Sequence, residues 1–281
     1  MLALSALLTC LLLAGGCGSG GDDASGADAG APQPGYATGR ISMADGSPIS
    51  VPYDELTFSI NGTAAHGENA SFTPVINADG SYRQKLSAGS FTFSGGSYAT
   101  IKLPYEGKKY TLQIEPVGPN WKRNRESAEG IVQDYVWKPV GEHASSDGDV
   151  NNFTNWYGGS VGVRFGTWRQ DVGVAPSKVP DGSKCIFTLK PTVGKTIDGE
   201  PAKTLTIERT FSAQWSRCDN LHDLPIAHYE LTGEVLFADG TKKPMLWHVT
   251  YAKYEPIQPI RFEPDDTMRA VTGILAEWII E

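Results

Sequence analysis

The chain has 281 residues, which is enough for one or two domains with buried cores. Its 32 acidic and 24 basic residues give a net charge of −8, and this balance argues against binding to nucleic acid, whose phosphates select for basic surfaces. The 32 glycines and 18 prolines favour a protein of many short strands joined by turns.

The N-terminal segment is apolar from Leu2 to Ala14. Crossing a bilayer takes about 20 residues, so this run of about 13 is too short to span one. It predicts the apolar core of a signal peptide that occupies residues 1–16. The small residues immediately before Cys17 resemble the lipobox of bacterial lipoproteins, and the resemblance implies that Cys17 becomes the lipid-carrying N-terminus.

Two features depart from that pattern: Ala14 stands where leucine is usual, and no Lys or Arg precedes the apolar run. A soluble secreted protein cleaved near Gly15 therefore stays open as the alternative.

The lipoprotein resemblance implies that Cys17 carries palmitate. It also implies that the lipid anchors the protein to a membrane of the bacterial cell envelope. Gly18 replaces the aspartate that is typical of retention in the inner membrane, which favours the outer membrane.

Residues 17–35 consist almost entirely of Gly, Ser, Asp, Ala and Pro and show no hydrophobic periodicity. Such a segment cannot bury enough apolar area to fold. It predicts a disordered tether that holds a folded domain away from the membrane.

From residue 36 to residue 118, short alternating segments are separated by turn signals. The turns are marked by Asp45-Gly46, Asn61-Gly62, Asp79-Gly80 and Ala88-Gly89, where glycine supplies the positive φ that tight turns need. About seven strands, with a turn about every 8 to 12 residues, predict one β-sandwich over residues 36–118.

The turns and core positions of this segment resemble the carboxypeptidase regulatory-like domain, a transthyretin-like β-sandwich. The matching residues are Gly39, Ile41, Asp45, Gly46, Pro48, Ile49, Asp79, Gly80, Tyr82, Leu86, Gly89 and Phe91. The resemblance implies a fold for residues 36–118 but no activity, since the zinc-binding catalytic module of those enzymes has no counterpart in the sequence.

Residues 119–159 form an aromatic-rich connector. Exposed Trp and Tyr rings stack on the faces of sugars, and nearby Asp and Asn side chains orient hydroxyl groups. The candidate ligand-binding residues are Trp121, Trp137, Trp156, Tyr157 and Trp168, with Asp147, Asp149 and Asn151 beside them. The alternative is that these aromatic residues fill the interface between two sandwiches.

Residues 160–281 predict a second β-sandwich. Alternating segments cover residues 185–191, 204–209, 228–237 and 245–251, and Asp239-Gly240 predicts a hairpin between the last two. The expected fold class is therefore all-β: two Greek-key or transthyretin-like β-sandwich domains after a signal peptide and a disordered tether. The mature chain also resembles uncharacterised secreted bacterial proteins, which brings no known activity.

Cys185 and Cys218 are the cysteines left over, because Cys10 lies in the signal peptide and Cys17 carries the lipid. In an oxidising compartment two such cysteines most often pair, so a Cys185–Cys218 disulfide is expected. Free buried thiols are the alternative. Two cysteines do not complete a structural zinc site, which takes four ligands.

Three patterns raise the question of chemistry. The expected hairpin brings His228 and His248 close to opposite positions, and with His222 and Asp223 nearby they could form a metal site, although no metalloprotease spacing supports it. Ordinary surface or edge histidines are the alternative. Asp147-Gly148-Asp149 opens like a calcium loop, but the positions that need Gly and Glu hold Asn152 and Gly158. Hydrogen bonds from these polar turn residues to their own backbone explain the loop more simply than calcium does.

Gly158-Gly159-Ser160-Val161-Gly162 matches the Gly-x-Ser-x-Gly pattern of a serine nucleophile. That pattern needs a helix after a strand, and none is expected here.

The sequence as a whole predicts a non-catalytic envelope lipoprotein without a cofactor. It would act as a binding or scaffolding module for a glycan or an envelope protein, and not for nucleic acid. The alternatives are a metal-dependent or hydrolytic envelope enzyme, and a purely structural protein with buried tryptophans.

Overall fold

The computed structural model describes residues 31–53, 55–64, 69–93, 99–118, 123–143, 148–149, 151–166, 179–215, 217–250, 253–265, 270–272 and 274–280. Within these ranges the regular elements are β-strands and two 3-10 turns, at Ser127–Glu129 and Phe153–Asn155. The all-β prediction is therefore confirmed. In the part of the chain so described, no helix has the length and apolar character needed to cross a membrane.

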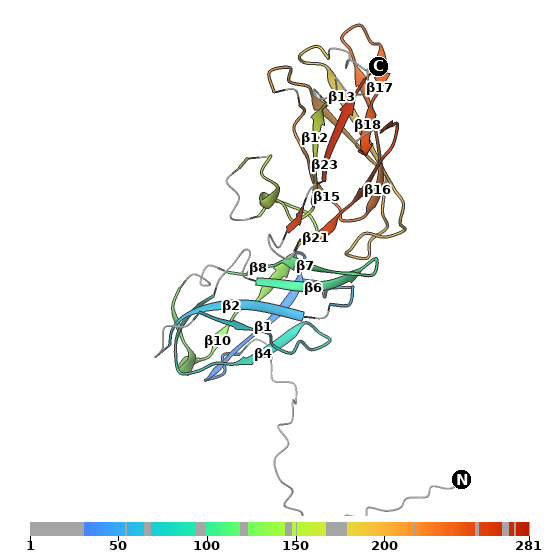
Figure 1. The fold of residues 1–281 in the computed structure, drawn as a ribbon. Helices are drawn as coiled ribbons and strands as arrows, with labels where there is room; N and C mark the ends of the chain where they lie inside the picture. The colour runs from blue at the N-terminus through green and yellow to red at the C-terminus, as the bar shows by residue number, and fades with distance from the viewer. Residues whose placement is uncertain are drawn as a thin grey trace, which may run out of the picture.

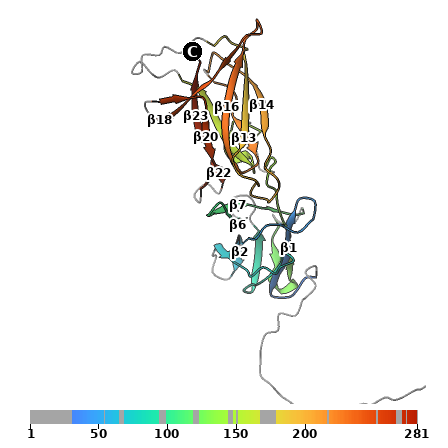
Figure 2. The ribbon, with the colours of Figure 1, turned by 90° about the vertical axis from the view of Figure 1, so that its right-hand side faces the viewer.

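The strands form two units that lie end to end (Figures 1 and 2). In the first unit, one sheet has the order β10-β1-β11-β8, and β4 also pairs with β1. Its strands are β1 (Tyr36–Met43), β4 (Ser81–Lys85), β8 (Glu115–Pro116), β10 (Ile131–Val132) and β11 (Tyr135–Trp137). The other sheet has the order β7-β6-β2-β5-β9, and β3 also pairs with β2. Its strands are β2 (Glu55–Ala64), β3 (Asn69–Phe72), β5 (Gly89–Phe93), β6 (Ala99–Tyr105), β7 (Lys108–Gln113) and β9 (Arg125–Glu126).

The first unit extends to Trp137, beyond the boundary at residue 118 that the sequence indicated. Strand β9 pairs with β5, while β10 and β11 pair in parallel with β1, where Ala37 faces Ile131 and Ile41 faces Tyr135. Residues 125–137 are thus part of the first sandwich and not of a separate connector. Local alternation marks these residues as strands but does not reveal a partner almost one hundred residues earlier.

The second unit also has two sheets, with the orders β15-β12-β23-β18-β19 and β14-β13-β16-β17, and β20 also pairs with β16. The strands of the first sheet are β12 (Gly159–Phe165), β15 (Leu221–Leu224), β18 (Leu246–Thr250), β19 (Lys253–Glu255) and β23 (Ile274–Ile279). Those of the second are β13 (Lys184–Pro191), β14 (Leu205–Thr210), β16 (His228–Leu236), β17 (Lys242–Pro244) and β20 (Gln258–Arg261). A separate pair, β21 (Glu263–Asp265) and β22 (Ala270–Thr272), lies beside β7 of the first unit.

Strand β13 shows why the sequence folds in this way. Cys185, Phe187 and Leu189 are spaced two residues apart, so they point to one side of the strand, and all three are fully buried. Because the strand pairs with β14 on one edge and β16 on the other, its backbone groups are also satisfied.

The hairpin at Asp239-Gly240 forms, but its second strand is shorter than predicted. It pairs β16 with β17 only, and the chain then crosses to the other sheet, where β18 pairs with β19 and β23. The chain passes from one sheet to the other at Met245, between β17 and β18. The Met245 amide donates to the Gly233 carbonyl at 2.8 Å, and a side chain on Gly233 would collide with the Met245 sulfur. The glycine in β16 therefore leaves the space through which the chain changes sheets.

The two units share a buried junction. The Tyr110 hydroxyl of β7 donates to the Phe262 carbonyl at 2.7 Å, and the Tyr105 hydroxyl of β6 donates to the Lys195 carbonyl at 2.8 Å. Tyr110 is only 1% exposed, and the buried apolar residues of both units form one continuous cluster. The units are therefore packed against each other and not merely linked.

Candidate functional site

Three of the aromatic residues proposed from the sequence, Trp137, Trp156 and Tyr157, lie in the described ranges, and they do not form an exposed platform. Trp137 is 2% exposed and Tyr157 is 7% exposed, so neither ring offers a face for a sugar to stack on. The alternation of β11 turns Tyr135 and Trp137 into the core, which explains the burial. Trp156 is half-buried and stacks on His222, with ring centroids 4.2 Å apart. Trp121 and Trp168 lie outside the described residues.

Tyr157 instead belongs to a polar group near the junction, which we call the junction cluster: Glu115, Lys138, His143, Tyr157 and Asp223. Lys138 Nζ lies 2.8 Å from the Glu115 carboxylate, and the His143 ring lies 3.8 Å from the Tyr157 ring. The Asp223 carboxylate accepts hydrogen bonds from the amides of Gly141 at 2.6 Å and Gly158 at 3.4 Å. The cluster thereby ties the end of the first unit to β15 of the second.

The electrostatics of the junction cluster keep two of its members neutral. Burial lowers the pKa of His143, and the nearby Glu115 charge only partly opposes this effect. Burial raises the pKa of the Tyr157 hydroxyl, and the Glu115 carboxylate raises it further. A neutral imidazole packed on a neutral phenol suits a structural contact.

Asp223 was a candidate metal ligand, but its carboxylate is engaged by backbone amides. Its backbone has a φ of +57°, a left-handed conformation that Asp tolerates better than most residues. The expected pairing of His228 with His248 is wrong, because β16 and β18 belong to different sheets. Among the described residues, no group of three or more His, Cys, Asp or Glu side chains could hold a metal ion.

The loop that resembled a calcium site is held by hydrogen bonds within the protein where the structure describes it. The Asp149 carboxylate accepts from the Asn151 amide at 2.9 Å, which is a bond typical of polar turn residues. The Asn151 side-chain oxygen accepts from the Asn220 amide at 3.1 Å, which joins the loop to the segment just before β15. Asp147 lies outside the described ranges.

Ser160 does not have the surroundings of a nucleophile. It is fully buried within β12, and its hydroxyl has no hydrogen-bond partner. An activated serine needs a base within hydrogen-bonding reach and an exposed oxygen. The Gly-x-Ser-x-Gly match is thus a feature of a core strand.

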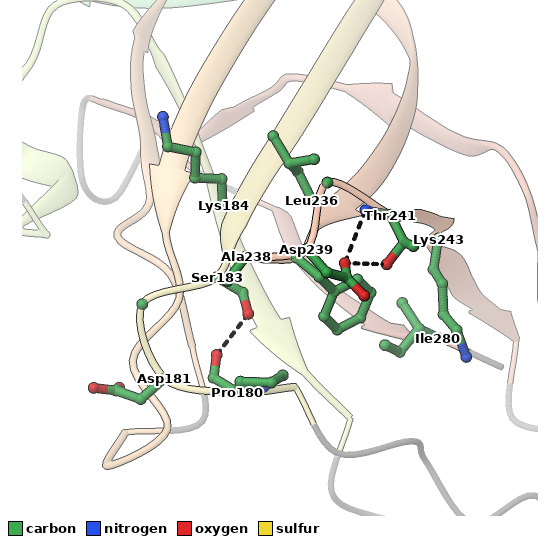
Figure 3. A pocket seen from close by; sticks show the side chains of 13 residues that line it. Pro180, Asp181, Ser183, Lys184, Leu236, Ala238, Asp239, Thr241, Lys243 and Ile280 are labelled. Atoms are coloured by element: carbon green, nitrogen blue, oxygen red, sulfur yellow. Dashed lines mark hydrogen bonds between the residues drawn. The ribbon is translucent and has the colours of Figure 1, made fainter.

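A cavity of about 810 Å³ lies beside β17 and the C-terminal end of the chain, at the end of the second unit that is far from the junction (Figure 1). Figure 3 shows the side chains that line it. It is lined by residues 180–184 and 236–241, Lys243 and Ile280. The Asp239 carboxylate accepts from the amide and the hydroxyl of Thr241, and the Ser183 hydroxyl donates to the Pro180 carbonyl. The lining also includes the charged side chains of Asp181, Lys184 and Lys243. The Asp181 carboxylate accepts from the Ala213 amide at 2.8 Å, and Lys184 Nζ lies 2.8 Å from the Glu208 carboxylate.

Sequence reasoning missed this cavity. Its signal was a pair of Asp-Gly turns, at Asp181-Gly182 and Asp239-Gly240, of which only the second was interpreted. Nothing in a single sequence shows that two turns almost sixty residues apart end at the same place. Trp215 was also missed as an exposed aromatic, although 64% of its surface is exposed.

The two remaining cysteines come together in the structure. Cys185 and Cys218 are both buried, and their side chains are in contact as free thiols in this structure, so the disulfide between them stays a prediction. Cys17 lies outside the described residues.

The fold and these sites define a two-sandwich, all-β protein. No family model matches the chain, and no curated protein matches it. Similar solved structures include a DUF3823 family protein from Bacteroides ovatus, which is 12% identical with a TM-score of 0.21 and covers 82% of this chain and 99% of its own. A second DUF3823 protein, from Parabacteroides merdae, is 10% identical with a TM-score of 0.18 and covers 82% and 100%.

A tetra-tandem repeat from the extending region of a large adhesion protein is 8% identical with a TM-score of 0.17 and covers 87% of this chain and 65% of its own. At such TM-scores these similarities assign no family.

Proposed function

We propose that this protein is a non-catalytic lipoprotein of the bacterial cell envelope, in which two joined β-sandwiches act as a rigid scaffolding or binding module. The observation that carries the proposal is the junction, where Tyr110 is buried and bonded to the Phe262 carbonyl. Contacts between domains that are large and apolar resist relative motion. The pair of sandwiches would then act as one spacer of fixed length.

The direction of the chain gives this spacer two distinct ends. Strand β1 begins at the end of the first unit that is remote from the second, and the cavity lies at the opposite end of the molecule (Figure 1). With a lipid on Cys17 and a tether over residues 17–35, the loops around the cavity would be held away from the membrane. We propose the outer membrane as the anchor site.

A non-catalytic role is supported by how the described polar groups are used. Asp223 holds backbone amides, His143 is buried against Tyr157, and Ser160 is enclosed in a strand. We favour an envelope protein over a glycan as the partner, because Trp137 and Tyr157 are not exposed for stacking. No cofactor and no nucleic acid are part of the proposal.

We also propose that the first sandwich is of the carboxypeptidase regulatory-like kind. The strand that carries Gly39 and Ile41 pairs with the strand that follows the Asp79-Gly80 turn, and Gly39 faces Tyr82. Three of the residues that carried the resemblance, Gly39, Ile41 and Tyr82, thus lie in one sheet.

The anchor is tested by labelling cells with an alkyne analogue of palmitate. The full chain should take up the label and fractionate with the outer membrane, and Cys17→Ser should do neither. Small-angle scattering of residues 31–281 should fit one rigid, elongated particle. A wild-type chain that takes up no label would contradict the lipid anchor on Cys17. Scattering from two domains that move relative to each other would contradict the rigid spacer.

The binding end is tested by photo-crosslinking in cells. Ala238, beside the cavity, and Ala88, on a turn of the first unit, are both exposed and can each be replaced by a photoreactive amino acid. A distal binding end predicts a discrete adduct from position 238 and none from position 88. Adducts of equal strength at both positions, or at neither, would contradict it.

A further inference from the structure

The second sandwich encloses a pair of thiols. Cys185 lies on β13 and Cys218 lies just before β15, and the two are 0% and 1% exposed. Their sulfur atoms are close enough to share a hydrogen bond. Two thiols that meet in a core, 33 positions apart in sequence, are placed by the fold and not by chain proximity.

Each cysteine is held in place by its neighbours. On β13, Cys185 faces Arg209 of β14 and Val235 of β16, so its strand is paired on both edges. On the other side, the Ser212 amide donates to the Arg217 carbonyl at 2.9 Å, and Arg217 also forms a bridge with Arg164 of β12. Cys218 is therefore fixed by contacts that lead to the opposite sheet, while Cys185 belongs to the central strand of its own.

The surroundings do not favour a reactive or metal-binding thiol. The hydrogen bond with Cys218 and burial both raise the pKa of Cys185, which disfavours the thiolate that nucleophilic or metal chemistry needs. The described residues contain no group of three metal-ligating side chains. A covalent bond between the two sulfurs is the chemistry that their contact allows.

We propose that Cys185 and Cys218 are joined by a structural disulfide that links the two sheets of the second sandwich. It forms by exchange with a disulfide-containing thiol oxidoreductase. The thiolate of one cysteine attacks the oxidant's S–S bond, which gives a mixed disulfide and releases one oxidant thiol. The other cysteine then attacks the mixed disulfide and releases the second thiol, so the oxidant carries away two electrons and two protons.

Since the folded core excludes solvent from both sulfurs, exchange takes place before the second sandwich closes or during its transient opening. The bond needs only an oxidising compartment. It is therefore independent of the lipid on Cys17, of the partner and of the spacer role, and each can fail without the others.

The test uses the full chain, secreted into a bacterial periplasm and purified without reductant. The protein is unfolded and alkylated before and after reduction, and its peptides are mapped by mass spectrometry. We expect a Cys185–Cys218 linked peptide, lighter by two hydrogen atoms than the separate pair, and alkylation at both positions only after reduction. Alkylation of both without reduction, or a bond from either cysteine to another molecule, would overturn the proposal.

A structural role is tested on the same protein by thermal unfolding. Reduction should lower the midpoint by about 10 °C, as expected for opening a loop of about 34 residues in a domain of this size. The Cys185→Ala/Cys218→Ala double variant should show the same midpoint with and without reductant. An unchanged midpoint of the reduced wild-type protein would mean that the bond is not structural.

Discussion

The hydroxyl of Tyr110, in the first sandwich, donates a 2.7 Å hydrogen bond to the main-chain oxygen of Phe262, in the second. Both residues are buried, so water does not replace the bond if it is lost. Tyr110→Phe should therefore lower the free energy of unfolding by about 1–2 kcal/mol, because it leaves a buried carbonyl without a donor.

The matched control is Tyr105→Phe. Its hydroxyl also crosses the junction, to the Lys195 carbonyl, but the side chain is partly exposed, and we expect a cost below about 1 kcal/mol. Urea unfolding of both variants measures the difference. Equal costs would mean that burial does not set the value of these bonds.

Two glycines with the same φ allow the cost of backbone strain to be measured separately from the cost of a steric clash. Gly46 and Gly80 both have a φ of +83°, but a side-chain carbon on Gly46 would meet nothing within 4 Å, and one on Gly80 would lie 2.4 Å from the Ile41 carbonyl oxygen. Gly46→Ala should cost about 1–2 kcal/mol from the left-handed conformation alone. Gly80→Ala should cost about 3 kcal/mol or more, because the turn must also move. Chemical denaturation measures the free energy of unfolding of both variants. Similar costs would show that the Asp79-Gly80 turn can move to accommodate a side chain at little cost.

Asp223 allows its backbone and side-chain roles to be measured separately. Asp223→Asn keeps a residue that tolerates a positive φ and a neutral acceptor for the Gly141 amide, and should cost about 1 kcal/mol. Asp223→Ala loses the acceptor and adds strain, and should cost about 2–4 kcal/mol. Asp223→Gly also loses the acceptor but relieves the strain of the positive φ, so its cost should fall between the other two. An Ala variant as stable as the Asn variant would contradict the role of this carboxylate in joining the units.

His143 should make stability depend on pH. Burial lowers its pKa in the folded state, whereas in the unfolded chain the pKa is about 6.5. Above about pH 6.5 the ring is neutral in both states and contributes no pH dependence. As pH falls below that value, His143 binds a proton in the unfolded chain but not in the folded protein. The free energy of unfolding therefore decreases until the pH passes the pKa of His143 in the folded state.

The measurement compares wild type with His143→Gln between pH 7.5 and pH 5. The Glu115, Lys138 and Asp223 groups that surround the ring are common to both proteins. The wild type should lose more stability, with a difference in slope of up to about one proton per molecule. Parallel curves below about pH 6.5 would show that the His143 ring takes up its proton in the folded state.

The fold class and many strands could be predicted from local pattern. Alternation at Cys185, Phe187 and Leu189 was enough to define a buried face, and the Asp239-Gly240 turn formed where the dipeptide indicated. Long-range pairing could not be predicted. The chain can leave the hairpin at Met245 because Gly233 has no side chain and the Met245 side chain takes that place, which only the assembled sheet shows.

The candidate site was harder to predict, because exposure is a tertiary property. The sequence marks Trp137 and Trp215 alike as large aromatic residues, yet the structure buries the first and exposes the second. The difference comes from what covers each residue. Trp137 ends a strand that pairs in parallel with β1, whereas Trp215 lies on a turn just before the Ser212–Arg217 bridge closes.

Each sandwich pairs its first strand in parallel with a strand from its own far end: β1 with β10 and β11, and β12 with β23. A chain that emerges from its N-terminus therefore presents β1 and β12 long before their partners exist. Such non-local pairing is slow to form. While the chain emerges, each unit stays open along one edge until its last strands arrive, and a fragment that stops at residue 118 would keep that edge of β1 unpaired.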